Sequence, residues 1–177
     1  MIIVIIGKCA SGKTTCANYL RETYDFKVYE IGDYVRKQYM LHHEKKKRLL
    51  EYVNSVFHEG KLCNFVELAI KESKNQNNSN IVFSGIRTVE EFGRIRNEYH
   101  KVFLIRVICS DENRERRYKK KERDSVSLQE RTITENKWNG EGSFNIVDYE
   151  LNNDSTKEEF YESIKQMIDI LSMGGIK

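Results

Sequence analysis

Eight residues near the amino terminus have the types and the spacing of a loop that binds phosphate. The pattern Gly-x4-Gly-Lys-Thr is met by Gly7-Lys-Cys-Ala-Ser-Gly-Lys-Thr14. Glycines at both ends free the backbone, so that its N–H groups can point inward at one anion. Lys13 would then reach the β and γ phosphates of a nucleotide, and the Thr14 hydroxyl would ligate Mg²⁺ between them. The residues predicted to bind the nucleotide are Gly7, Ala10, Ser11, Gly12, Lys13, Thr14 and Thr15.

The loop stands between a predicted strand and a predicted helix. Residues 1–6 form an unbroken apolar run that is almost entirely β-branched, which is typical of a strand buried on both faces of a parallel sheet. Residues 14–20 continue as a helix, whose amino-terminal dipole would add positive potential at the phosphates. The alternative is a plain glycine turn with a chance Lys-Thr pair. All fixed positions of the pattern occur in the strand–loop–helix context, which favours phosphate binding.

A second group of polar residues follows the next predicted strand. The alternation over Phe26–Ile31 predicts a short strand, and Gly32 with Asp33 predicts a turn after it. Because ligands of an open α/β sheet gather at the carboxyl ends of its strands, we expect Asp33 and Arg36 to lie near the phosphates. An N-cap of the following helix is an equally good role for Asp33.

Arg87 also follows a predicted strand. The strand is Ile81–Ser84, and Thr88 with Glu91 has the form of a capping box that starts a helix. The strand would therefore deliver Arg87 to the same edge of the sheet, where a planar guanidinium suits a phosphate oxyanion. The alternative is a structural salt bridge at the strand end.

Apolar residues recur at helical spacing between His42 and Asn75 and predict two helices with a break near Gly60. The basic run 44–48 in this region is interpreted as a solvated helix face.

The densest basic run of the chain lies on a helix after the strand predicted for Val102–Cys109. Arg and Lys fill most positions of residues 114–123, and Ser127 with Glu130 forms a second capping box. Two interpretations fit the run: a mobile basic flap over nucleotide phosphates, or a weak RNA-binding face. The flap is favoured, because RNA-binding modules interleave aromatic residues for stacking and Tyr118 is the only one here.

The remaining chain predicts one more strand and a closing helix. Residues 136–142 are predicted to be a loop, whose Trp138 either packs on the core or stacks on a base. A strand is predicted for Phe144–Leu151, a turn for Asn152–Asp154, and a capping box at Ser155–Glu158 opens the last helix. Strands and helices thus alternate, which predicts an α/β fold of five parallel strands with helices on both faces.

Length and composition limit the class of protein. A chain of 177 residues suits a single domain with a real core. A net charge of +3 argues against a dedicated nucleic-acid or membrane-surface protein. The cysteines have neither metal-site nor disulfide spacing. Because no stretch reaches the length of a membrane span, and residues 1–6 form a strand rather than a secretory signal, we expect a cytoplasmic protein.

These motifs together resemble the P-loop nucleoside monophosphate kinase group, particularly the adenylate-kinase-like and dephospho-CoA-kinase-like proteins. The resemblance is carried by Gly7–Thr14, by Gly32-Asp33-x2-Arg36, by Gly85-Ile-Arg87 with the acidic pair after it, and by the Arg-rich run. It spans essentially the whole chain. A poorly characterised prokaryotic family within the group shares the Gly-Asp-x2-Arg, the Gly-Ile-Arg and a tryptophan near Trp138.

The resemblance implies a three-layer α/β/α P-loop NTPase fold with the sheet order 2-3-1-4-5. It implies ATP with Mg²⁺ as the donor, and a small phosphate-bearing acceptor, foremost a nucleoside monophosphate. It places the acceptor's phosphate on Arg36 and Arg87 and the adenine beside Asn153. The implied parts of the single domain are a helical acceptor-binding region at about 33–75 and a basic lid at about 114–131. The candidate lid arginines are Arg114, Arg117, Arg123 and Arg131.

One position departs from the family pattern. Similar kinases usually end the third strand in Asp-Gly, and the carboxylate holds Mg²⁺ through water, whereas this chain has Ser84-Gly85. A magnesium ion near Thr14 and Ser84 would then lose a charged group behind its water ligands. Either Asp33 compensates, or turnover is weak, or the protein binds nucleotide without much chemistry.

The acceptor is left open. A phosphate acceptor is already anionic and needs no base, whereas a hydroxyl, as in dephospho-CoA, needs a nearby carboxylate such as Asp33. Two arginines beside the acceptor favour a phosphate. The rival interpretations are a nucleotide-binding regulator or slow NTPase, and a nucleotide binder associated with RNA. The residues predicted to act in catalysis are Lys13, Asp33, Arg117, Arg123 and Arg131.

Overall fold

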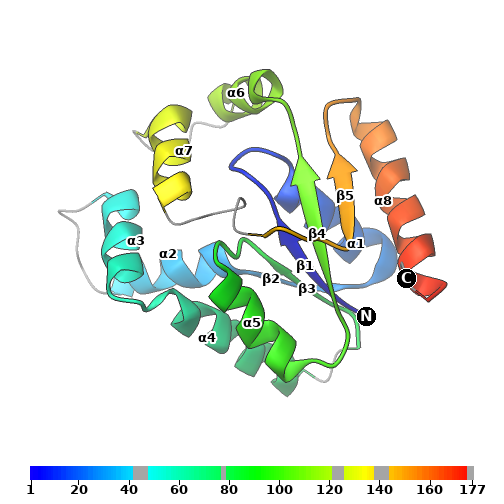
Figure 1. Ribbon diagram of the computed structural model, residues 1–177, viewed down its shortest axis with the longest axis horizontal. Coiled ribbons are helices and arrows are strands. Elements are labelled where there is room, and N and C mark those ends of the chain that lie inside the picture. The colour runs from blue at the N-terminus through cyan, green and yellow to red at the C-terminus, as the bar shows by residue number, and fades with distance from the viewer. Residues whose placement is uncertain (42–47, 77–78, 121–125, 138–143, 175–177) are drawn as a thin grey trace.

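The computed structural model describes residues 1–41, 48–76, 79–120, 126–137 and 144–174 (Figure 1). These residues form one parallel sheet in the order β2-β3-β1-β4-β5. The predicted α/β fold and the implied strand order are therefore confirmed. The strands are β1 (Ile2–Ile6), β2 (Lys27–Glu30), β3 (Ile81–Ser84), β4 (Val102–Ile108) and β5 (Tyr149–Asn152).

Helices cover both faces of the sheet. Val4 on the central strand faces one apolar cluster with residues of α4 and α5, and Ile3 faces the other with residues of α1 and α8. Helices α6 and α7 stand beyond the carboxyl ends of the strands (Figure 1). The helices are α1 (Lys13–Tyr24), α2 (Ile31–Leu41), α3 (Leu49–His58), α4 (Leu62–Asn75), α5 (Val89–Glu98), α6 (Asp111–Lys120), α7 (Leu128–Lys137) and α8 (Lys157–Ser172).

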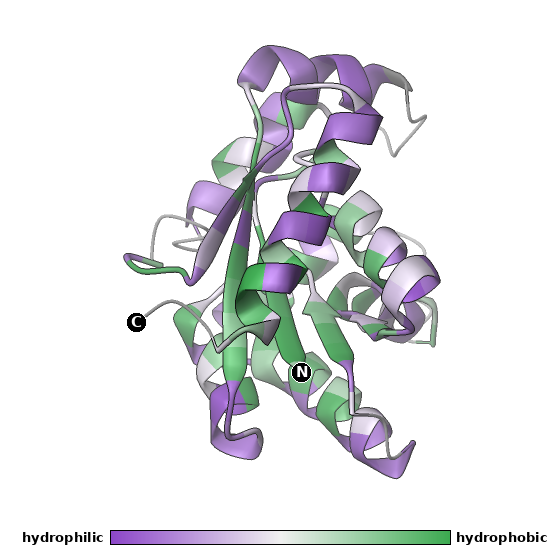
Figure 2. Cartoon of the chain, turned by 90° about the vertical axis from the view of Figure 1, so that its right-hand side faces the viewer, coloured by the Kyte–Doolittle hydropathy of each residue, from purple (hydrophilic) through white to green (hydrophobic). Residues whose placement is uncertain are grey.

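The apolar run at the amino terminus becomes the central strand because it is apolar on both sides. All five residues of β1 are buried, and β3 and β4 pair with it on its two edges. Figure 2 shows the hydrophobic strands enclosed by helices whose outer faces are hydrophilic. In the described residues, no helix combines the length and the apolar character that crossing a membrane would demand.

Two predicted boundaries near the site are wrong. The turn predicted at Gly32 and Asp33 is helical, because α2 begins at Ile31 directly after β2. Asp33 therefore lies in the first turn of α2 and is not its N-cap. The strand predicted for Phe144–Leu151 starts only at Tyr149. Just before Tyr149, the main-chain N–H of Leu104 donates a hydrogen bond to the Asp148 carboxylate. In a longer strand this N–H would bond to a main-chain carbonyl instead.

Smaller differences concern helix ends. Helix α7 runs to Lys137, into the predicted loop, and the last helix is capped one residue later than expected, by Thr156 with Glu159. The capping box of Thr88 with Glu91 is confirmed. The basic run 44–48 lies outside the described residues except for its last member, and Arg123 and Trp138 lie outside them altogether.

Candidate nucleotide and acceptor site

The glycine loop connects β1 to α1 and is packed closely on both sides. Gly7 has φ +145°, and a Cβ there would lie 2.4 Å from the carbonyl oxygen of Val107 on β4. Gly12 has φ +114°, and a Cβ there would lie 2.0 Å from Nδ2 of Asn153. Both conformations and both contacts exclude a side chain. The glycines of the motif are therefore required by the packing of the loop as well as by its turn.

Lys13 begins α1 and points back into the loop. Its Nζ donates to the carbonyl oxygens of Gly7 at 2.5 Å and of Lys8 at 2.9 Å. Desolvation lowers the pKa of the Lys13 ammonium from its usual value, and the nearby Glu135 carboxylate opposes that shift. A buried ammonium gains more from an incoming polyphosphate than an exposed one would, because the local dielectric is low.

A cavity of about 470 Å³ lies beside the loop, within the usual size range of small-molecule sites. It brings together residues from the loop, the ends of β2 and β3, and helices α6, α7 and α8. The predicted site residues that line it are Ala10, Gly12, Lys13, Thr14, Thr15, Arg36, Arg87, Arg117, Arg131 and Asn153. The described site residues outside its lining are Gly7, Ser11, Asp33 and Ser84.

Asp33 is not where the sequence predicted it. Its side chain is 68% exposed and pairs with Arg36, one helical turn further along α2. Arg36 itself lies over Gly32 and lines the cavity. The early start of α2 explains the difference, because it turns Asp33 toward solvent while Arg36 reaches the cavity.

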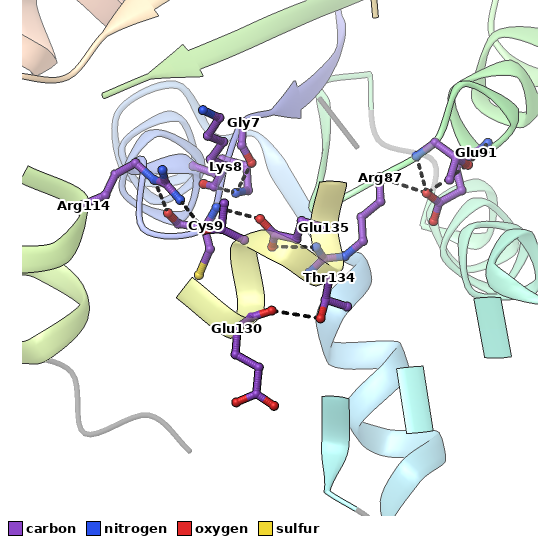
Figure 3. Close-up of polar contacts among 12 residues, drawn as sticks. Gly7, Lys8, Cys9, Arg87, Glu91, Arg114, Glu130, Thr134 and Glu135 are labelled. Carbon is purple, nitrogen blue, oxygen red and sulfur yellow. Dashed lines mark hydrogen bonds and ion pairs between the residues drawn. The ribbon is translucent and has the colours of Figure 1, made fainter. Parts of the chain in front are cut away.

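Arg114 does not line the cavity, as an arginine that clamps a transferred phosphoryl group would. It is 2% exposed, and its Nε donates to the carbonyl oxygen of Cys9 in the loop at 2.9 Å. The rest of its guanidinium pairs with Asp111 and donates to Thr132 Oγ1 at 3.2 Å. Arg114 therefore joins α6 and α7 to the glycine loop (Figure 3).

Arg117 and Asn153 hold the other side of the loop. Nδ2 of Asn153 donates to the carbonyl oxygen of Ser11 at 2.7 Å. Arg117 donates from Nη2 to the carbonyl oxygen of Asn153 at 2.8 Å and from Nη1 to that of Ser11 at 3.4 Å. The turn after β5, where the resemblance placed the adenine, thus directly adjoins the loop.

Glu135 on α7 lies at the centre of the site and was not predicted. Its Oε1 accepts from Nη1 of Arg87 at 2.7 Å, and its Oε2 accepts from the main-chain N–H of Cys9 at 3.2 Å (Figure 3). Burial alone would raise the pKa of Glu135, but the charges of Arg87 and Lys13 lower it below its usual value. The Glu135 carboxylate therefore bridges the loop and Arg87. Arg87 thus forms a salt bridge at the end of β3, which was the alternative to phosphate binding.

No sequence signal pointed to Glu135. It lies on a mainly polar helix, outside any motif, and is 126 residues from Cys9. Glu135 meets its partners, Cys9 and Arg87, because α7 packs over the loop. A second unpredicted carboxylate, Glu30 at the end of β2, also lines the cavity.

A parallel sheet in this order, a loop ending in Gly-Lys-Thr and the adjoining cavity define a P-loop kinase-like protein. Residues 3–139 match the model of AAA_18, described as an AAA domain, and the chain belongs to this family. The match covers the loop, Arg87 and Glu135. The family match does not distinguish adenylate-kinase-like or dephospho-CoA-kinase-like proteins from other members of the class.

Curated relatives of similar length and solved structures of similar fold also match the chain. UPF0200 proteins of Saccharolobus islandicus strain L.S.2.15 and Saccharolobus solfataricus strain P2 are each 29% identical to this chain, covering 98% of it and 95% of their own length. TT1252 from Thermus thermophilus has a TM-score of 0.65 at 21% identity, covering 96% of both chains. A shikimate kinase from Aquifex aeolicus has a TM-score of 0.59 at 16% identity, covering 99% of this chain and 100% of the kinase. These structural matches show the fold alone.

The buried position of Arg114 predicts a role in stability. Arg114→Ala removes the donor to the Cys9 carbonyl and leaves that oxygen buried, so we expect urea denaturation without nucleotide to give a free energy of unfolding lower by about 2–4 kcal/mol. Arg116→Ala is the matched control: Arg116 is exposed and bonds only to the neighbouring Asn113 among the described residues, and its loss should cost under about 0.5 kcal/mol. Equal stability of the two variants would contradict this role.

The lowered pKa of Glu135 predicts a pH-dependent contribution to stability. Because the pKa is lower in the folded protein, the ionised carboxylate stabilises the fold above about pH 4.5 and loses this effect as the pH falls through the folded pKa. Glu135→Gln should therefore lower the free energy of unfolding by about 1–3 kcal/mol at pH 7, with a smaller difference at pH 4. Glu22→Gln, on the exposed side of α1, is the control. A difference for Glu135→Gln that stays constant from pH 7 to pH 4 would rule out the ion pair as its cause.

Proposed function

We propose that this protein transfers the γ-phosphoryl group of ATP, with Mg²⁺, to a small acceptor that carries a phosphate, foremost a nucleoside monophosphate. The observation that carries the proposal is that the loop with Lys13 and the arginines Arg36 and Arg87 line one cavity. The loop supplies the donor site, and the two arginines supply a second anion site. The fold of shikimate kinase and sugar kinase structures supports phosphoryl transfer in general.

The donor would be held mainly by the backbone and by Lys13. Loop amides and the start of α1 bind the phosphates, and the Lys13 ammonium contacts the β and γ phosphates. The Thr14 hydroxyl, which lines the cavity, suits Mg²⁺ as a hard oxygen ligand; the ion would neutralise charge on the phosphates. Asn153 and Arg117 form the wall nearest the expected adenine.

The transfer itself needs positioning and positive charge rather than covalent chemistry from the protein. Arg36 and Arg87 orient the acceptor phosphate in line with the γ phosphate. Arg117 and Arg131, which line the cavity from α6 and α7, stabilise the charge on the transferred group. Arg123 belongs to the same proposed lid of about residues 114–131, outside the described residues.

A second candidate is transfer to a hydroxyl group, and one observation favours it. A hydroxyl acceptor needs a carboxylate to take its proton, and Glu135 places one between the loop and Arg87. Asp33, the base expected for this alternative, lies outside the cavity lining. An assay of Glu135→Gln separates the candidates: a base is needed only for the hydroxyl, so transfer to a phosphate acceptor should survive the substitution.

The remaining alternatives are a nucleotide-binding regulator, a slow NTPase and an RNA-associated binder. ADP formation that requires the acceptor indicates a kinase, whereas ADP formation without any acceptor indicates an NTPase. The inward contacts of Arg114 and Arg117 weaken the RNA-binding alternative, because they remove two cations from the outer face of the basic run. RNA affinity that falls steeply with salt would support it instead.

Lys13→Ala should abolish transfer while the protein remains folded. Within the described parts of the chain, the ammonium donates hydrogen bonds to loop carbonyls alone, so its loss removes charge at the phosphates without opening the core. We expect ADP formation, measured with ATP and a panel of nucleoside monophosphates and dephospho-CoA, to fall at least about 100-fold. Lys8→Ala, which changes the exposed lysine of the same loop, is the control. Wild-type turnover by folded Lys13→Ala would overturn the loop assignment.

Arg87→Ala should weaken binding of the acceptor far more than that of ATP. Loss of one guanidinium–phosphate contact is expected to raise the apparent KM of the acceptor about 10- to 100-fold, with little change in the KM of ATP. Arg94→Ala, which removes an exposed arginine of α5, controls for a general loss of charge. Equal increases in both KM values would remove Arg87 from the acceptor site.

A further inference from the structure

Two side chains at the carboxyl edge of the sheet lack the partners that buried polar groups require. Glu30 ends β2 and Ser84 ends β3, and the register pairs these two residues across the strands. Oε1 of Glu30 and Oγ of Ser84 are both buried without a hydrogen-bond partner among the described residues. Leaving such atoms unsatisfied is costly, so their presence indicates a water or an ion that they serve.

The Glu30 carboxylate reaches from β2 across the end of β3. Its Oε2 is 3.9 Å from the position that a Cβ on Gly85 would take, and Glu30 lines the same cavity as Lys13 and Thr14. The carboxylate therefore lies beside the residue that follows Ser84, where the strand order brings the loop of β1 close. A carboxylate on β3 itself would point to the same edge of the sheet.

Asp33 is a poor substitute for the missing β3 carboxylate. It is largely exposed, pairs with Arg36 and lies outside the cavity lining. Glu30, by contrast, lines the cavity, and its Oε1 is buried without a hydrogen-bond partner among the described residues. Among the described residues, the carboxylates that line the cavity are Glu30 and Glu135, and Glu135 is already held by Arg87 and Cys9.

We propose that Glu30 supplies from β2 the negative charge that Ser84 does not supply from β3, and that its carboxylate accepts hydrogen bonds from the water ligands of Mg²⁺. The inference rests on the proposed function, since it assumes that ATP and Mg²⁺ bind at the loop. The donor set of a carboxylate and hydroxyls fits Mg²⁺, which prefers oxygen ligands and keeps several of its waters. Glu30 is thus a positioning residue for the ion.

The test measures binding rather than turnover. Isothermal titration calorimetry gives the Kd of a non-hydrolysable ATP analogue with Mg²⁺ and again with EDTA. The Kd in EDTA divided by the Kd in Mg²⁺ reports how much the ion contributes to binding. Glu30→Gln should reduce this ratio about 10-fold or more. Its Kd in EDTA should stay the same or become lower, because a negative charge near the phosphates has been removed. Glu22→Gln on the exposed side of α1 is the matched control.

Two further variants locate the charge. Ser84→Asp in the Glu30→Gln background moves the carboxylate back to β3 and should restore the ratio, provided that circular dichroism shows a folded protein. If that variant does not fold, Glu30→Asp takes its place: the shorter side chain keeps the charge but falls short of Gly85, and the ratio should drop. A wild-type ratio for Glu30→Asp would show that the full length of the Glu30 side chain is not needed.

The outcomes separate this inference from the proposed function. If the wild-type protein binds the analogue in neither buffer, the proposed function fails and the inference fails with it. If the wild-type protein depends on Mg²⁺ and Glu30→Gln keeps the full ratio, the inference alone is overturned. A ratio that is lost in Asp33→Asn and kept in Glu30→Gln would assign the charge to Asp33.

Discussion

The glycine loop depends on hydrogen bonds that its own backbone cannot make. A loop that turns its N–H groups toward an anion leaves its carbonyls facing the protein, where they need donors. Arg114 supplies one to Cys9, and Asn153 supplies one to Ser11. These donors come from α6 and from the turn after β5. The amino-terminal motif therefore acquires its shape only when the carboxy-terminal part of the sheet has packed against it.

The charge around the cavity is predominantly positive. Lysine and arginine side chains from five helices and from the loop after β3 face two carboxylates. Burial of Lys13 strengthens its interaction with a nearby negative charge, because the local dielectric is low. The Glu135 carboxylate neutralises part of this positive charge, because it accepts hydrogen bonds from a loop N–H and from Arg87. A phosphate at either place would compete for the same donors. A phosphate bound there would therefore compete with the contacts that Glu135 of α7 makes to the loop and to Arg87.

The sheet and the loop could be predicted from the sequence because their signals are local. An unbroken β-branched run and a fixed glycine spacing determine β1, the loop and α1. The inward contacts of the basic run could not be predicted, since charged residues surround most of α6, and Tyr118, which is buried, is its single aromatic residue. Arg114 and Arg117 lie on the inward face and Arg116 on the outward one. The contacts of Glu135 join residues distant in sequence. Asp33 was misplaced because α2 starts at Ile31, three residues before the expected first residue Tyr34.

The distribution of carboxylates bears on which acceptors the site can serve. With Asp33 directed to solvent and Glu30 assigned to the metal, Glu135 is the remaining carboxylate of the described cavity lining that could take a proton. It cannot both hold Arg87 and act freely as a base, because the ion pair lowers its pKa and so its basicity. An acceptor phosphate that captures Arg87 would release Glu135, but such an acceptor is already charged and has no need of a base. The contact between Arg87 and Glu135 therefore favours an acceptor that brings its own negative charge into the site.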